Sequence, residues 1–209
     1  GGFTVGWTNT AAPQHVNLYS YDANGEPIGQ QIAVSVDESV ALTGSDNIEL
    51  AELGDGSLLA VWSATANGNQ DVFGKIVSAP PPVFWNVSSV SKLNSVDTGA
   101  QTNPGVAALP NNRFVMVYED RAGNDGSVSG IFGGIYDADT RLIHDCGVVN
   151  TTTNSFQEFP HVAAAPLLRR QRPRPRPHLP RLRLPRLLRR PPLRAGPRRH
   201  RVHGPPRRA

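Results

Sequence analysis

A repeat of about 56 residues constrains this sequence more than any other feature. Residues of similar character recur in three columns, which are Trp7, Trp62 and Tyr118; Leu50, Val106 and Val162; and Val16, Val72 and Ile131. The first two columns keep the same interval throughout, to within one position. Self-similarity on this scale is typical of solenoids, propellers and other arrays in which each copy is one supersecondary unit.

Each copy has the pattern of β structure. The stretch QIAVSV at residues 31–36 alternates apolar and polar side chains, which indicates a half-buried strand. SLLAVWS and RFVMVYE are more continuously apolar and favour strands buried on both faces. No stretch of about 12 or more residues has helical apolar spacing. In the first copy we expect four strands, at Phe3–Thr8, Val16–Tyr21, Gln31–Val36 and Asn47–Leu53.

Four short strands per copy predict an all-β fold, a partial β-propeller-like array of about three four-stranded repeats. The units span about 1–53, 54–109 and 110–166, and the last strand of a unit leads through a tight turn into the Trp or Tyr strand of the next. A string of small β-sandwiches is the alternative, although a unit of this length is short for a sandwich. Propellers have about 4–8 blades, so three units do not close a ring. We therefore interpret the chain as a piece of a longer protein.

Several motifs resemble a known family. GGFTVGW, YDANGEPIG, VNTTTNSFQEFPHVAAAP and GVAAL are similar to the tandem repeats of very large secreted or surface-attached bacterial proteins. The resemblance covers residues 1–166 and implies a propeller-like fold, a location outside the cell or on its surface, and a role in adhesion. Such proteins often carry neighbouring calcium-binding, glycine-rich repeats of the hemolysin type. The middle unit departs from the pattern, because SAPPPVFWNV replaces its Tyr-Asp-Ala-x-Gly hairpin.

The charge of the chain is divided between two unlike parts. Residues 1–166 hold all 17 acidic residues and five of the 21 basic ones, a net charge of −12, whereas residues 167–209 hold 16 arginines and no acid. Every residue type in this basic tail has a codon beginning with C or G, as in a GC-rich gene read out of frame. We predict a disordered tail and a frameshift product. It mixes no Lys with its Arg and has no aromatic residue, so nucleic acid is not the partner we expect.

No arrangement in the sequence predicts catalysis. The histidines His15, His144 and His161 belong to different strand contexts, and no Gly-x-Ser-x-Gly motif is present. The acidic pairs are Glu119 with Asp120, Glu49 with Glu52, and Asp137 with Asp139, and each lies at an expected strand end or turn, where acids are usually solvated. His144 and Cys146 could supply two metal ligands, but two are too few for a site. We instead expect a half-exposed histidine and a buried cysteine there, and we expect no enzyme.

Calcium is the one cofactor for which the sequence offers candidate ligands. DRAGNDGSVSG, from Asp120 to Gly130, places Asp120, Asn124 and Asp125 among glycines in a loop between two strands. Carboxylate and carbonyl oxygens in such loops are typical ligands of hard cations. An ordinary turn loop accounts for the same residues and is the interpretation that we favour.

The function expected from these features is that of a non-catalytic repeat module of a secreted or surface bacterial protein. It would serve as a scaffold for adhesion or for binding a cell-surface glycan or protein. The aromatic column could form a carbohydrate-stacking stripe, but its place in each strand favours core packing. The alternative function is a fragment of a secreted hydrolase, of glycosidase or peptidase type, whose catalytic residues lie outside this chain. No stretch is long and apolar enough for a membrane span.

Overall fold

The computed structural model describes residues 1–9, 14–36, 42–78 and 86–165. These residues form twelve β-strands and no helix, so the all-β prediction is confirmed. In the described ranges no helix is long and apolar enough to cross a membrane. The chain divides into a unit of residues 1–166 and a second of residues 167–209. The predicted disordered tail lies outside the described residues.

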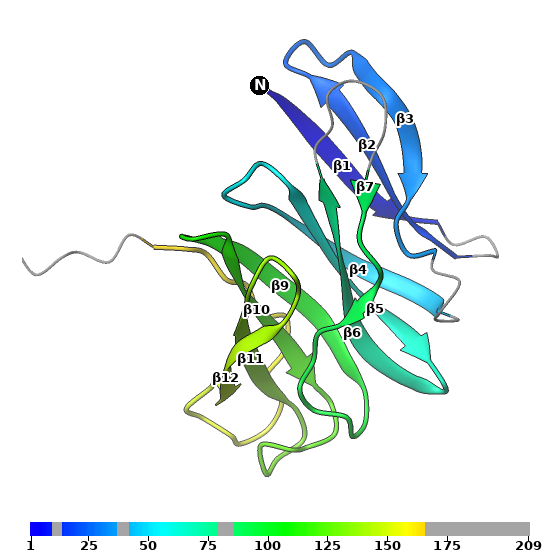
Figure 1. The fold of residues 1–209 in the computed structure, drawn as a ribbon. Coiled ribbons are helices and arrows are strands. Elements are labelled where there is room, and N and C mark those ends of the chain that lie inside the picture. The colour runs from blue at the N-terminus through cyan, green and yellow to red at the C-terminus, as the bar shows by residue number, and fades with distance from the viewer. Residues whose placement is uncertain (10–13, 37–41, 79–85, 166–209) are drawn as a thin grey trace, which may run out of the picture. The chain divides into compact units, whose positions relative to one another are not determined.

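Three antiparallel sheets follow one another along the described part of the chain (Figure 1). The first sheet contains β1 (Gly2–Thr8), β2 (Val16–Asp22) and β3 (Pro27–Ala33), in that order. The second sheet has the order β4 (Thr43–Glu52), β5 (Leu58–Ala66), β6 (Asn69–Ser78) and β7 (Asn86–Val87), and β8 (Ser91–Lys92) also pairs with β6. The third sheet has the order β9 (Gln101–Leu109), β10 (Arg113–Asp120), β11 (Gly130–Tyr136) and β12 (Leu142–Val148).

Strand β3 begins earlier than its apolar alternation predicts, at Pro27 rather than Gln31. The cause is the tight turn that precedes it. One carboxylate oxygen of Asp22 accepts the backbone N–H groups of Asn24 and Glu26 at 2.8 and 2.9 Å, and Gly25 takes a φ of 87°. Asp and Gly favour such a turn because Asp bonds the backbone two residues on and Gly tolerates positive φ. Pairing with β2 therefore starts as soon as the turn ends.

The repeat seen in the sequence corresponds to a matching register in space. Trp62 lies opposite Phe73, and Tyr118 lies opposite Phe132. Trp7 has the same place in the first sheet, opposite Asn17. β1, β5 and β10 are therefore counterparts, and so are β4 and β9, which we call the leading strands because each comes first in its sheet. The described residues of the first sheet include no leading strand.

Each leading strand contains the same irregularity. The pairing of β4 with β5 shifts between Asp46 and Glu49, and that of β9 with β10 shifts at the corresponding place, beyond Thr102. Left-handed backbone marks the bulge, with a φ of 50° at Asn47 and 49° at Asn103. Phe159, at the same place one unit later, has a φ of 54° although it lies in no strand. Asn adopts this conformation readily, but a bulky aromatic residue rarely does.

The core forms where one sheet stacks on the next. Trp62 and Ala60 are fully buried and pack with Val16 and Leu18 of the first sheet. In the same way the Tyr118 face of the third sheet packs on the opposite face of β5, against Leu59 and Val61. Strand β9 contacts β4, β5 and β6 (Figure 1). The aromatic column thus packs in the core at Trp62 and Tyr118, as predicted, whereas Trp7 is only partly buried.

Candidate functional site

The predicted calcium residues take part in hydrogen bonds within their loop and with neighbouring segments. Asp120 is fully buried, and its carboxylate accepts three N–H groups: the side chain of Gln101 at 2.8 Å, and the backbone and side chain of Asn124 at 3.0 to 3.1 Å. Such donors already satisfy the negative charge and several lone pairs of the group. Asp120 and Asn124 therefore close the loop by hydrogen bonding.

Asp125 belongs to a different part of the same loop. Its carboxylate accepts the backbone N–H of Ser127 at 3.0 Å and the Asn150 side chain at 3.4 Å, and it lies over Gly130, where a Cβ would come within 2.8 Å of it. The described residues contain no group of three acidic, histidine or cysteine side chains arranged to hold a metal ion. The hydrogen bonds of these residues fit a structural loop better than a cation site. Calcium binding stays a prediction, which a calcium titration would test.

Asp120 is instead the end of a buried polar chain that joins the second and third sheets. Asn94, which is 6% exposed, donates to Asp71 at 2.8 Å and to the side-chain oxygen of Gln101 at 3.3 Å. The side-chain N–H of Gln101 in turn donates a hydrogen bond to Asp120. At the other end, the Lys92 ammonium lies 3.0 Å from Asp71. Buried polar groups of this kind stabilise only when each has partners, as these do.

The polar chain contains a motif that the sequence analysis missed. The side-chain oxygen of Asn94 accepts the N–H of Val72 at 2.8 Å, and that of Asn150 accepts the N–H of Ile131 at 2.7 Å. Each Asn also bonds a Gln seven residues later, Gln101 or Gln157. The spacing Asn-x6-Gln, which recurs one unit later, was the signal in the sequence that could have revealed it. In the first sheet, Ser35 supplies the acceptor, to Val16 at 2.9 Å.

A shallow depression is lined by corresponding residues of the two leading strands and of segment 159–161. Its volume is about 240 Å³, and it is lined by Asn47, Ile48 and Glu49 of β4, by Asn103 and Pro104 of β9, and by Phe159, Pro160 and His161. These residues are the bulges and their direct neighbours. Bulges commonly re-aim side chains next to binding sites. The depression is the place where the repeat presents polar and aromatic groups together at the surface.

An ion pair between a buried carboxylate and a half-exposed guanidinium lies beside this depression, so the expectation that the Glu119 and Asp120 carboxylates are solvated is wrong. Glu119 is fully buried and accepts Arg121 Nε at 2.6 Å and the Asn103 side chain at 2.6 Å. The hydrogen bond from Arg121 to Glu119, together with the attraction of Glu158 and Asp46, raises the pKa of the guanidinium. Glu119 therefore holds the Asn103 side chain in place at the edge of the depression.

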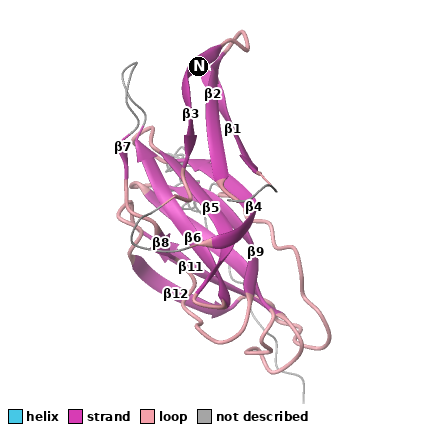
Figure 2. Cartoon of the chain, turned by 90° about the vertical axis from the view of Figure 1, so that its right-hand side faces the viewer, coloured by secondary structure: helices cyan, strands magenta, loops and turns pink. Residues whose placement is uncertain are grey.

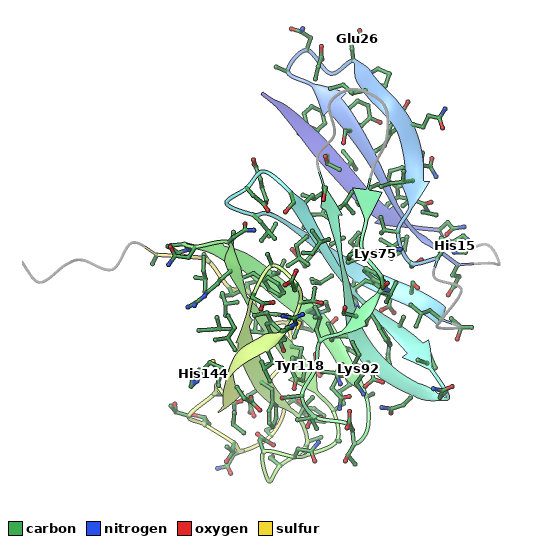
Figure 3. All side chains as sticks on the ribbon, viewed as in Figure 1. His15, Glu26, Lys75, Lys92, Tyr118 and His144 are labelled. Carbon is green, nitrogen blue, oxygen red and sulfur yellow. The ribbon has the colours of Figure 1, made fainter. Side chains whose placement is uncertain are left out.

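The other candidates from the sequence are dispersed. His15 lies next to the first sheet and His144 on β12 of the third, so the two are not brought together (Figure 3). Cys146 is exposed, and the prediction of a buried cysteine is wrong, because β12 is the outer strand of its sheet and Cys146 has no layer over it. Asp137 serves its hairpin turn by accepting the N–H groups of Asp139 and Arg141 at 2.9 Å.

Comparison with known proteins gives no further assignment. No protein-family model, no curated protein and no solved structure matches this chain.

Proposed function

We propose that this chain is a non-catalytic repeat module of a secreted or surface bacterial protein, and that it binds a cell-surface glycan or protein. Its sheets would be consecutive blades of a propeller-like array. Three features support such an array: the four-stranded meander order of the third sheet, the matching register of β5 and β10, and the stacking of Trp62 and of Tyr118 on the sheet that precedes each of them. Location and adhesion rest on the resemblance of the repeat motifs.

The depression at the bulges is the binding site we propose. It is the observation that carries the proposal, because all three repeats contribute equivalent positions to it. Asn47 and Glu49 offer an amide and a carboxylate, and Phe159, 64% exposed, offers an aromatic face. Hydroxyl-rich ligands are bound by this combination of hydrogen-bonding groups and an aromatic platform. The polar residues outside the depression, such as Asp71 and Asp120, are occupied in holding sheets together.

Binding can be tested on a printed array of cell-surface glycans and on immobilised extracellular matrix proteins. The full chain would be labelled and applied at raised salt, which screens the charges of the arginine-rich tail. The double variant Asn47→Gly, Glu49→Ala removes two polar groups of the depression, and Gly keeps the left-handed backbone at position 47. We expect it to lose the bound signal at least tenfold.

A matched control exists in the turn of the first sheet. Asn24→Gly, Glu26→Ala changes the same residue types at the same spacing on an exposed hairpin (Figure 3). It should bind as the parent does. Equal binding by the two double variants, or no bound ligand on either surface, would contradict the proposal.

A further inference from the structure

Two surfaces of the described chain are left without the partners that their counterparts have. On one side, β1 pairs only with β2, so its other edge is open (Figure 2). Its counterparts β5 and β10 are each paired on both edges, and a leading strand occupies the position that is open in β1. An open edge presents unpaired N–H and C=O groups that favour the addition of another strand.

On the other side, segment 157–165 has the properties of a leading strand but pairs with none. Its sequence QEFPHVAAA matches QTNPGVAAL of β9, with Pro160 and Val162 at the places of Pro104 and Val106. Phe159 already has the left-handed φ of the bulge, 54° against 49° at Asn103. An exposed phenylalanine in this conformation is strained. The segment therefore has the sequence and backbone conformation of a leading strand, but the described residues contain no strand that pairs with it.

The sheet faces next to these two edges are also complementary, because each exposes apolar side chains whose counterparts in the other sheets are buried. Phe3 and Val5 are 53% and 43% exposed, whereas Phe114 and Met116, their counterparts in β10, are fully buried against the preceding sheet. Within the described part of the chain, the outer face of the third sheet lacks the following sheet that covers the corresponding face of the second sheet. Val115 and Ile131 are only partly buried there, although their counterparts Leu59 and Val72 are fully buried under the third sheet. The apolar side chains of one face could therefore pack against those of the other and remove both from water.

We propose that the open edge of β1 binds segment 157–165 of a second copy of this chain, and that two copies do this reciprocally. The added strand would give the first sheet its missing leading strand, and Phe3 and Val5 would pack on the outer face of the partner copy's third sheet. Two copies of three sheets make six, within the range of about 4–8 blades that closes a propeller. A head-to-tail contact that closes gives a ring rather than a filament.

The register of the contact follows from the repeat. Leu50 lies opposite Ala60 and Val106 lies opposite Met116. One unit later, Val162 takes the place of Leu50 and Val106. One unit earlier, Val5 takes the place of Ala60 and Met116. Val162 of one copy and Val5 of the other therefore face each other across the contact. Directly opposed residues of antiparallel strands have Cα atoms about 4.5–5.5 Å apart, which is within the reach of a disulfide.

Cross-linking tests this register directly. In a Cys146→Ser background, which removes the native thiol, the pair Val5→Cys and Val162→Cys should give a disulfide-linked dimer on mild oxidation, seen on a non-reducing gel. The control pair Thr4→Cys and Val162→Cys is shifted by one residue, which turns the two thiols to opposite faces of the sheet. Equal cross-linking by the two pairs, or none by the first, would overturn the proposal.

The solution mass tests the association without cysteines. Light scattering of the full chain at about 100 µM in 0.5 M salt should give twice the 22.5 kDa of one chain. Val5→Lys places a charge in the contact and should reduce the mass to that of one chain. Ile28→Lys is the matched control, because Ile28 is 45% exposed and lies on β3, away from the open edge. A monomeric parent chain, or the same mass for the two lysine variants, would refute the reciprocal contact.

Discussion

Replacing Asn94 by alanine should cost about 3 kcal/mol of unfolding free energy, far more than most single substitutions outside a hydrophobic core. The change leaves the buried N–H of Val72 without its acceptor, which costs about 1–3 kcal/mol. It also removes a hydrogen bond to the Asp71 carboxylate, worth about 1.5–3 kcal/mol. Lys92 remains on Asp71 and offsets part of the loss. We therefore expect a value below the sum of the two contributions.

The chain supplies its own controls for this prediction. Asn150 makes the equivalent bonds to Ile131 and Gln157, but it is partly exposed, so water can replace the lost partner. Asn150→Ala should cost about 1 kcal/mol or less. Asn94→Ser should fall between the two alanine variants, because Ser35 shows that a hydroxyl can accept the equivalent N–H, although it cannot reach as many partners.

Urea unfolding, followed by the fluorescence of the buried Trp62, measures all three variants against the parent chain. The slopes against urea should agree, so that differences in midpoint report differences in free energy. The reasoning is refuted if Asn94→Ala costs no more than Asn150→Ala. It is also refuted if Asn94→Ser is as unstable as Asn94→Ala, since the acceptor at this position would then contribute nothing.

Three further predictions concern the candidate calcium loop, one turn and one glycine. Because hydrogen bonds already occupy the carboxylates of that loop, we expect no rise in Tm at millimolar calcium, whereas a saturable rise that Asp125→Asn abolishes would support the calcium site. Hydrogen bonds from Ser57 and then Asn112 hold the pKa of Asp55 below its ordinary value, so Asn112→Ala should raise it, as an NMR titration of the carboxyl carbon would detect. A lowered pKa stabilises the fold above about pH 4 and not below the folded-state pKa, so this variant should lose more stability at pH 7 than at pH 2, and an equal loss at both would contradict the assignment. Gly74→Ala places a Cβ 2.5 Å from Leu93 and should cost about 1–3 kcal/mol in the same urea assay, whereas a neutral result would mean that the Leu93 side chain moves aside freely.

The repeat, the strands and most turns could be predicted from the sequence because they depend on short-range rules. Alternation with a period of two follows from strand geometry, and the expected ranges of β1 and β2 agree with the structure to within a residue at each end. The matching columns at Trp62 and Tyr118 required identical register, because a shift of one residue would turn every side chain to the other face. Strand β3 was displaced because the Asp22 turn, and not the apolar pattern, decides where pairing begins.

The candidate site was less accessible to the same reasoning. Asp120 was predicted as a cation ligand from its neighbours in the sequence, and no local pattern indicated its hydrogen bond to Gln101, 19 residues away on another strand. The left-handed bulges at Asn47 and Asn103 were missed because the matching position is Phe159, a residue that propensity excludes from this conformation. Cys146 was expected to be buried from its residue type alone, and only the position of β12 at the sheet edge exposes it.

The sequence by itself determined that three copies of a β unit exist and which side of each strand is apolar, since both are set by the pleat of the backbone. Only the tertiary structure decided which polar side chains pair with one another and which edge and faces stay open. Those outcomes depend on the stacking of sheets whose contacting residues are tens of positions apart, and local pattern carries no information about distances of that kind.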